Sequence, residues 1–190
     1  MHSTLPPARG LYDPRFEHDA CGVSFVVDIK GRKSHGIVAS ALGALCSMEH
    51  RGATGAEPDT GDGAGILVQI PDAFLRAVSG VTLPEVGAYA VGIAFLPSDG
   101  VLCEKAIDSI ERIVAEEDLR VIGWRSVPVD PSCLGASALR VMPTFKQLFV
   151  DDPRGAKGID LDRRMFVVRK RIEHELPSEQ RTYFPSLSSR

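Results

Sequence analysis

Short β-branched apolar segments alternate with amphipathic helical segments along the chain, and this alternation most constrains the fold. Residues 21–29, CGVSFVVDI, are typical of a buried strand. Residues 34–50 carry apolar side chains at three- and four-residue spacing, which predicts a helix with one apolar face that ends at Gly52. Further strands are predicted at residues 66–70, 89–96, 120–129, 145–150 and 183–189, and further helices at 71–78, 103–117 and 163–175. The pattern favours a layered α/β or α+β sandwich over a bundle or barrel.

The composition argues against nucleic-acid and membrane binding. The net charge of -3 gives no electrostatic attraction to polyanions. Residues 163–171 include five basic side chains, but no aromatic stacking platform accompanies them, so we interpret them as a solvated helix face. No segment has the ~20 consecutive apolar residues of a membrane span, and residues 1–20 lack the apolar region of a secretory signal. We therefore expect a cytoplasmic protein.

The four cysteines, at positions 21, 46, 103 and 133, are too widely spaced for a CxxC zinc or dithiol site. Without an export signal, we expect reduced thiols. Cys46 lies on the apolar face of the predicted helix, which predicts a core residue, and Cys103 and Cys133 are interpreted as structural. Taken alone, Cys21 would be a small buried residue at the head of a strand.

Two longer motifs change the interpretation of Cys21. Residues 16–23, FEHDACGV, resemble the maturation site of the glutamine amidotransferase part of glutamate synthase large chains, and residues 48–65, MEHRGATGAEPDTGDGAG, resemble that family's second block. Residues 122–130, IGWRSVPVD, and 186–190, SLSSR, extend the resemblance, which covers the chain from about Gly10 to its end.

The resemblance implies a class II, N-terminal-nucleophile glutaminase domain. Its fold is α+β, a four-layer αββα sandwich, here incomplete at the C-terminal end because Arg190 falls in the middle of the family's domain. Residues 1–20 would be a propeptide and residues 21–190 the N-terminal part of the domain. Cys21 would attack the side-chain amide of glutamine, release ammonia and form a glutamyl thioester. In the parent enzyme, the ammonia would aminate 2-oxoglutarate.

The residue types suit this chemistry. A thiol with a pKa of about 8.5 is largely protonated at neutral pH and needs a base. An α-amino group, with a pKa of about 7.7–8.0, can supply that base once Cys21 is N-terminal. The small neighbours Ala20 and Gly22 leave room for cleavage of the bond between residues 20 and 21.

Other residues have two interpretations each. Arg51 is either a cation at a helix end or, as the resemblance implies, a ligand for the substrate carboxylate, for which its planar donor fork is suited. His50 is interpreted as a helix-end residue rather than a base. The loop at residues 59–65 fits neither a phosphate nor a calcium motif and is expected to form a structural wall of the active site. Residues 17–19, EHD, either assist cleavage or hold an extended segment.

We expect no cofactor or metal in this segment. The resemblance implies FMN and an iron–sulfur cluster in the full-length enzyme. The expected partners are glutamine, the synthase (FMN) domain of the same chain and a small reductase subunit. Because the family's oxyanion-hole and remaining substrate residues lie beyond position 190, the isolated chain is expected to be inactive. The alternatives are a non-catalytic domain of the same fold, another class II amidotransferase, or a thiol redox or metal protein.

Overall fold

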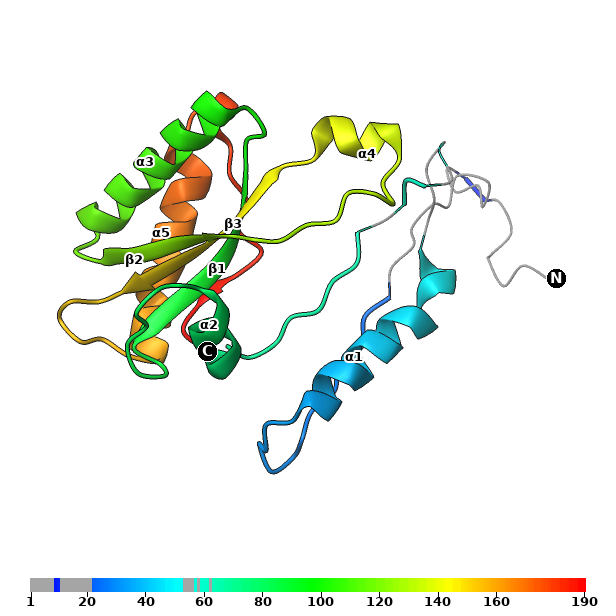
Figure 1. The fold of residues 1–190 in the computed structure, drawn as a ribbon, viewed down its shortest axis with the longest axis horizontal. Coiled ribbons are helices and arrows are strands. Elements are labelled where there is room, and N and C mark those ends of the chain that lie inside the picture. The colour runs from blue at the N-terminus through cyan, green and yellow to red at the C-terminus, as the bar shows by residue number, and fades with distance from the viewer. Residues whose placement is uncertain (1–8, 11–21, 53–56, 58, 62) are drawn as a thin grey trace. The chain divides into compact units, whose positions relative to one another are not determined.

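The computed structural model describes residues 9–10, 22–52, 57, 59–61 and 63–190 (Figure 1). These residues form two compact units. The first contains the described residues up to Leu67 together with residues 134–137, and the second contains residues 68–133 and 138–190. Each unit is considered by itself below.

A four-stranded antiparallel sheet is the centre of the second unit. In the described part of the chain, its strand order is β2-β3-β1-β4, and β1 pairs with β3 over its whole length. A bulge between Val121 and Gly123 shifts the register of β2 against β3. The strands are β1 (Tyr89–Leu96), β2 (Arg120–Ser126), β3 (Thr144–Asp151) and β4 (Leu187–Ser188).

Two long helices, α3 (Gly100–Glu116) and α5 (Ile159–Glu175), cover one face of this sheet (Figure 1). The Asp99 side chain caps α3 by accepting a hydrogen bond from the amide of Leu102 at 2.9 Å. Apolar residues at helical spacing in both helices meet the alternating inward residues of the strands. The main core contains Ile110, Ile113, Leu148, Val150, Leu161, Met165 and Val168, all fully buried.

A shorter helix, α2 (Asp72–Val78), belongs to a smaller core on the opposite face. This core contains Leu75, Leu83, Tyr89 and Phe149. Gly123 is required there, because a Cβ at this position would lie 2.6 Å from Cγ2 of Val81. Farther along β1, the same face of the sheet is less covered, and Ile93 is 38% exposed. On this face, Phe95 stacks edge-to-face on Phe145, with ring centroids 4.9 Å apart.

The predicted elements of the second unit are confirmed. Strands at 89–96, 120–129 and 145–150 correspond to β1, β2 and β3, and the helices at 71–78, 103–117 and 163–175 correspond to α2, α3 and α5. The predicted strand at 183–189 is shorter, because only residues 187–188 form β4 and Tyr183 makes an isolated bridge to Phe95. Residues 130–143, for which the sequence predicts neither a helix nor a strand, contain α4 (Ala136–Val141). The α+β class is thus confirmed.

Two predicted strands, at residues 21–29 and 66–70, are absent from the described part of the chain. Residues 22–29 and 66–70 form no strand in the described part of the chain. Most of their apolar side chains are exposed instead, with Phe25 88% and Ile29 98% accessible to solvent, whereas Ile70 is partly buried against the smaller core. The reason is that no described strand pairs with either segment, and strand backbone is stable only when its amide and carbonyl groups are paired. The predicted helix is present as α1 (His35–Ser47), followed by the 3-10 turn η2 (Glu49–Arg51).

Three further predictions about single residues have different outcomes. Cys103 is buried in the main core, as expected. Cys46 is exposed, so the prediction of a core residue was wrong; α1 buries no residue at all, so its apolar face provides no core for Cys46 to join. Cys133 is likewise exposed and takes no part in a core.

The basic stretch in α5 is only partly a solvated helix face. Arg163 is exposed, but Arg164 and Arg171 have side chains only 22% and 24% exposed. Arg164 pairs with the buried carboxylate of Asp152 and donates to the backbone carbonyl oxygen of Glu117. Because their partners lie on neighbouring elements, these two arginines connect α5 to the rest of the second unit.

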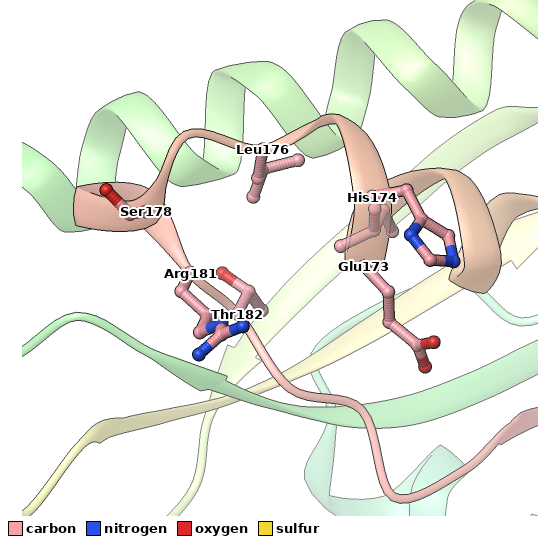
Figure 2. A pocket seen from close by; sticks show the side chains of 7 residues that line it. Glu173, His174, Leu176, Ser178, Arg181 and Thr182 are labelled. Carbon is pink, nitrogen blue, oxygen red and sulfur yellow. The ribbon is translucent and has the colours of Figure 1, made fainter.

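The end of α5 and the 3-10 turn η3 (Ser178–Gln180) surround a cavity of about 320 Å³ (Figure 2).

None of the helices in the described part of the chain has the length and apolar character needed to cross a membrane.

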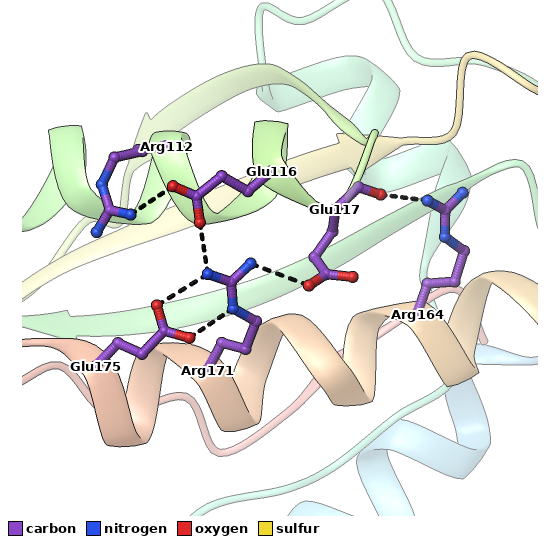
Figure 3. Close-up of polar contacts among 6 residues, drawn as sticks. All are labelled: Arg112, Glu116, Glu117, Arg164, Arg171 and Glu175. Carbon is purple, nitrogen blue, oxygen red and sulfur yellow. Dashed lines mark hydrogen bonds and ion pairs between the residues drawn. The ribbon is translucent and has the colours of Figure 1, made fainter.

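Arg171 joins α5 to α3 through a network of ion pairs (Figure 3). Its guanidinium lies 2.5 Å from Glu116 Oε2, 3.0 Å from Glu117 Oε1 and 2.5 Å from Glu175 Oε1. Hydrogen bonds from Arg171 and then from Arg112 hold the pKa of Glu116 below its usual value, and Arg171 has the same effect on the pKa of Glu175. Three carboxylates therefore share one guanidinium, whose fixed fork suits several acceptors.

We predict that Arg171→Leu will reduce the loss of stability that the protein shows at acidic pH. The lowered pKa values of Glu116 and Glu175 mean that these carboxylates stabilise the fold above the ordinary glutamate pKa of about 4.3, and that this stabilisation is lost as pH falls through the lower folded-state values. Urea unfolding followed by circular dichroism, from neutral pH to about pH 3, should show a smaller decrease in the free energy of unfolding for the variant than for the unaltered protein.

The control for this experiment is Arg163→Leu, which removes an exposed arginine paired with Asp160 on the same helix. Its free energy of unfolding should fall with decreasing pH as that of the unaltered protein does. If the free energy of unfolding of Arg171→Leu fell equally, the assignment of the lowered glutamate pKa values to Arg171 would be contradicted.

Candidate functional site

The position after Cys21 lies against the end of the first helical segment. A Cβ at Gly22 would be 2.9 Å from the sulfur of Met48 and 3.4 Å from the Cβ of Arg51. Met48 connects α1 to η2, and Arg51 is the last residue of η2. A larger residue at position 22 would have to displace this turn, so the glycine permits the close approach.

The structure thus brings together the residue next to the predicted nucleophile and the predicted substrate-binding arginine. Cys21 itself lies outside the described residues, as do Ala20 and the propeptide residues 17–19. Arg51 is exposed and follows His50, which is also exposed, in the last turn of η2. This position is compatible with both interpretations of Arg51, because a helix-end cation and a ligand for a carboxylate would each occupy an exposed turn.

A carboxylate that the sequence analysis did not single out organises the described part of the glycine-rich loop. Glu57 accepts hydrogen bonds from the amide of Ser137 at 3.0 Å, from the Ser137 hydroxyl at 2.8 Å and from the Thr60 hydroxyl at 3.0 Å. These donors, with the Ser137 amide as the largest contributor, hold the pKa of Glu57 below its usual value. Glu57 is therefore an ionised acceptor that ties the loop to residues 134–137.

Gly135 completes this arrangement. Its amide donates to the carbonyl oxygen of Asp59 at 3.1 Å. A Cβ at position 135 would lie 2.4 Å from the Thr60 hydroxyl oxygen and 2.7 Å from Oε2 of Glu57. The loop around residues 57–61 is thus braced by polar contacts from residues 134–137, and its role as a wall of the active site stays a prediction.

The three cysteines in the described part of the chain have different surroundings. Burial raises the pKa of Cys103, which disfavours its thiolate. Cys46 and Cys133 are exposed and unbridged. Across the residues that the structure describes, no three His, Cys, Asp or Glu side chains are grouped closely enough to hold a metal ion.

Sequence reasoning missed Glu57, Ser137 and Gly135 because their contacts join positions 80 residues apart along the chain. The local signal that existed was the three-residue spacing between Glu57 and Thr60, which share a hydrogen bond. That spacing is common in loops and does not identify the distant partner.

We predict that Gly135→Ala will open the Glu57 arrangement. The added methyl group has no room between Thr60 and Glu57, so the Ser137 amide should lose its acceptor. Hydrogen exchange of that amide, measured by NMR, should become about tenfold faster, the order expected when a hydrogen bond to a charged group is lost. The pKa of Glu57 should rise toward its ordinary value. Gly63→Ala is the matched control, because no atom of the described residues lies within 4 Å of a Cβ at that position. Equal exchange rates in the two variants would contradict the prediction.

Comparison with known proteins identifies the family. The family model for glutamine amidotransferases class-II matches residues 21–190. The NADPH glutamate synthase large chain of Bacillus subtilis (strain 168) is 40% identical over 191 residues, covering 99% of this chain and 13% of that protein. The NADH glutamate synthase of Schizosaccharomyces pombe is 40% identical over 96% of this chain and 9% of that protein. Ferredoxin-dependent glutamate synthase 2 of Synechocystis sp. is 39% identical over 86% of this chain and 11% of that protein.

The chain thus spans between 9% and 13% of the length of these relatives. Because the family model extends over nearly the whole chain, this protein belongs to the class II glutamine amidotransferases.

Proposed function

We propose that the chain is the glutaminase part of a glutamate synthase large chain, with Cys21 as its nucleophile. The observation that carries the proposal is that the family match begins at Cys21, while the structure places Gly22, the next residue, against Arg51. The relatives that match nearly the whole chain are glutamate synthases with three different electron donors in their names, which supports this parent enzyme over other class II amidotransferases.

The reaction begins with activation of the Cys21 thiol. Its own α-amino group, with an ordinary pKa of about 7.7–8.0, accepts the thiol proton directly or through one water molecule. The sulfur then forms a bond to the side-chain carbonyl carbon of glutamine. The carbon–nitrogen bond breaks, and the leaving nitrogen takes up the proton to depart as ammonia. Water hydrolyses the resulting glutamyl thioester, which releases glutamate and restores the thiol.

Arg51 would bind the α-carboxylate of glutamine. Its guanidinium offers a planar pair of donors that matches a carboxylate. The short distance between its Cβ and the position of a Cβ at Gly22 supports this role.

The amine can act as a base only after removal of residues 1–20. Within a peptide bond, the nitrogen of Cys21 would be an amide and could not accept the thiol proton. We therefore propose that residues 1–20 are a propeptide and that cleavage between Ala20 and Cys21 precedes activity. The beginning of the family match at residue 21 supports this boundary.

The four-layer αββα sandwich is proposed for the complete domain. The face of the four-stranded sheet that carries Ile93 and Phe95 is incompletely covered, as one inner face of a sandwich requires, although it also carries the hydrogen-bonded pair Arg125 and Gln147. Residues 22–29 and 66–70, with their exposed apolar side chains, are the candidates for strands of a second sheet.

The wider activity follows from the parent enzyme. Ammonia released at Cys21 would pass to a synthase domain of the same chain, where 2-oxoglutarate is aminated. FMN and an iron–sulfur cluster are proposed for that domain, and a small reductase subunit is the proposed electron-supplying partner. We propose a cytoplasmic location for the enzyme.

One observation favours an alternative. Residues 22–29 form no strand, although a nucleophile is most effective when a rigid element holds it. The alternative is a domain that keeps the fold without glutaminase chemistry.

Cys21→Ala should decide between them in the complete enzyme. Glutamine-dependent glutamate formation should fall by a factor of at least about 10³, since the variant lacks the attacking atom. Formation from added ammonia should be unchanged, because it bypasses amide hydrolysis. Cys46→Ala is the matched control at an exposed thiol and should retain both activities. A Cys21→Ala enzyme with unimpaired glutamine-dependent activity would refute the proposal.

A separate measurement tests maturation. Intact-mass analysis and N-terminal sequencing of the purified enzyme should find Cys21 as the first residue, and a glutamine-analogue electrophile should label Cys21 alone. An active enzyme that retains residues 1–20 would rule out the α-amine as the base. Labelling at Cys46 would count against the assignment of the nucleophile.

A further inference from the structure

The cavity at the end of α5 has the size and lining of a small ligand site (Figure 2). Its volume of about 320 Å³ lies at the lower end of the range of about 300–1,000 Å³ typical of ligand pockets. It is formed by the last turn of α5, the residues that follow it and the turn η3. None of the residues assigned to amide hydrolysis lines it.

One part of the lining is apolar. Ile172 is 1% exposed and belongs to the main core, and Leu176 packs against that core. Leu176 is fixed by a hydrogen bond from its amide to the carbonyl oxygen of Ile172. These two side chains offer a firm surface to a short aliphatic group.

A second part of the lining is anionic. The Glu173 carboxylate is held by Lys170 at 2.5 Å and lies 3.7 Å from Nε of Arg169. The hydrogen bond from Lys170 is the largest cause of the lowered pKa of Glu173, so the group is ionised at neutral pH. A carboxylate has about four acceptor positions, which leaves capacity for another donor. Glu173 also lies in the last turn of α5, where the carbonyl ends of the helix favour a positive charge.

A third part of the lining is cationic. Arg181 follows η3 and is exposed, and among the described residues its guanidinium makes no hydrogen bond or ion pair. Figure 2 shows Arg181 and Glu173 on different segments that border the cavity. Ser178 lines the same cavity, and its hydroxyl donates to the Glu179 carboxylate at 3.3 Å. An arginine without a partner beside an apolar surface is suited to bind a carboxylate.

We propose that this cavity binds a free α-amino acid with a short aliphatic side chain. The ligand's ammonium group would lie toward Glu173 and the end of α5, and its carboxylate would bind Arg181. Its side chain would lie against Ile172 and Leu176. A simple carboxylate could use only Arg181, and a simple amine could use only Glu173, whose charge Lys170 and Arg169 already partly balance. A zwitterion satisfies both groups, and this complementarity distinguishes amino acids from simple carboxylates or amines.

A ligand series on the unaltered protein tests the proposal without any variant. The probes are norvaline, pentanoate, which lacks the ammonium group, and butylamine, which lacks the carboxylate. NMR titration should show shifts of the backbone amides around His174 and Thr182 with norvaline at millimolar concentrations. Pentanoate and butylamine should each bind about tenfold more weakly or worse, since each loses one charged contact.

Substitutions at two positions locate the site. Arg181→Leu and Glu173→Gln should each weaken norvaline binding by about tenfold, and Arg181→Lys should weaken it less because the charge remains. Arg163→Gln, at an exposed arginine of the same helix, is the matched control and should bind norvaline as the unaltered protein does. Circular dichroism verifies that each variant is folded.

Two results would overturn the proposal. One is the absence of shifts in this region with norvaline, which would leave an unoccupied surface cavity. The other is equal binding of norvaline and pentanoate, which would indicate a simple anion site. Loss of glutaminase activity in Cys21→Ala has no bearing on either result, so the failure of one proposal is distinguishable from the failure of the other.

Discussion

The packing of α3 and α5 against one face of the sheet is the interaction on which the second unit depends. Ile110 and Ile113 of α3 are fully buried against Leu148 and Val150 of β3, a central strand. Burial of such side chains is the largest favourable contribution to folding. It also sets the two helices side by side, which is why Arg171 can reach carboxylates on α3. The charged network and the cavity at the end of α5 are thus consequences of an apolar core.

The first unit is organised differently. Its helix α1 buries no residue, and the apolar residues of its predicted strand are exposed. Close polar and steric contacts position its segments instead: Glu57 receives three hydrogen bonds, and Gly22 fits against Met48 and Arg51. Such contacts specify an arrangement more than they stabilise it, because polar groups exchange water for protein partners at a small net gain.

The local sequence was sufficient for some of the candidate site and insufficient for the rest. Cys21 and Arg51 stand in contiguous motifs, so their chemistry could be predicted without a fold. The contact between Glu57 and Ser137 could not be predicted, since it joins positions 80 residues apart. The presence of Glu173 and Arg181 in the lining of one cavity could not be predicted either, since it depends on how the chain turns after α5.

The sequence by itself determined most helices and strands of the second unit and led to the proposal of Cys21 as the nucleophile. Alternating apolar residues at 89–96 and helical spacing at 103–117 are local patterns with local consequences. Residues 22–29 carry an equally strong strand pattern and form no strand, because a strand needs backbone partners that its own sequence does not contain. Arg163 and Arg171 are equivalent in the sequence, yet one is solvated and the other joins two helices. Tertiary structure decided these outcomes, since pairing and burial depend on residues that are distant along the chain.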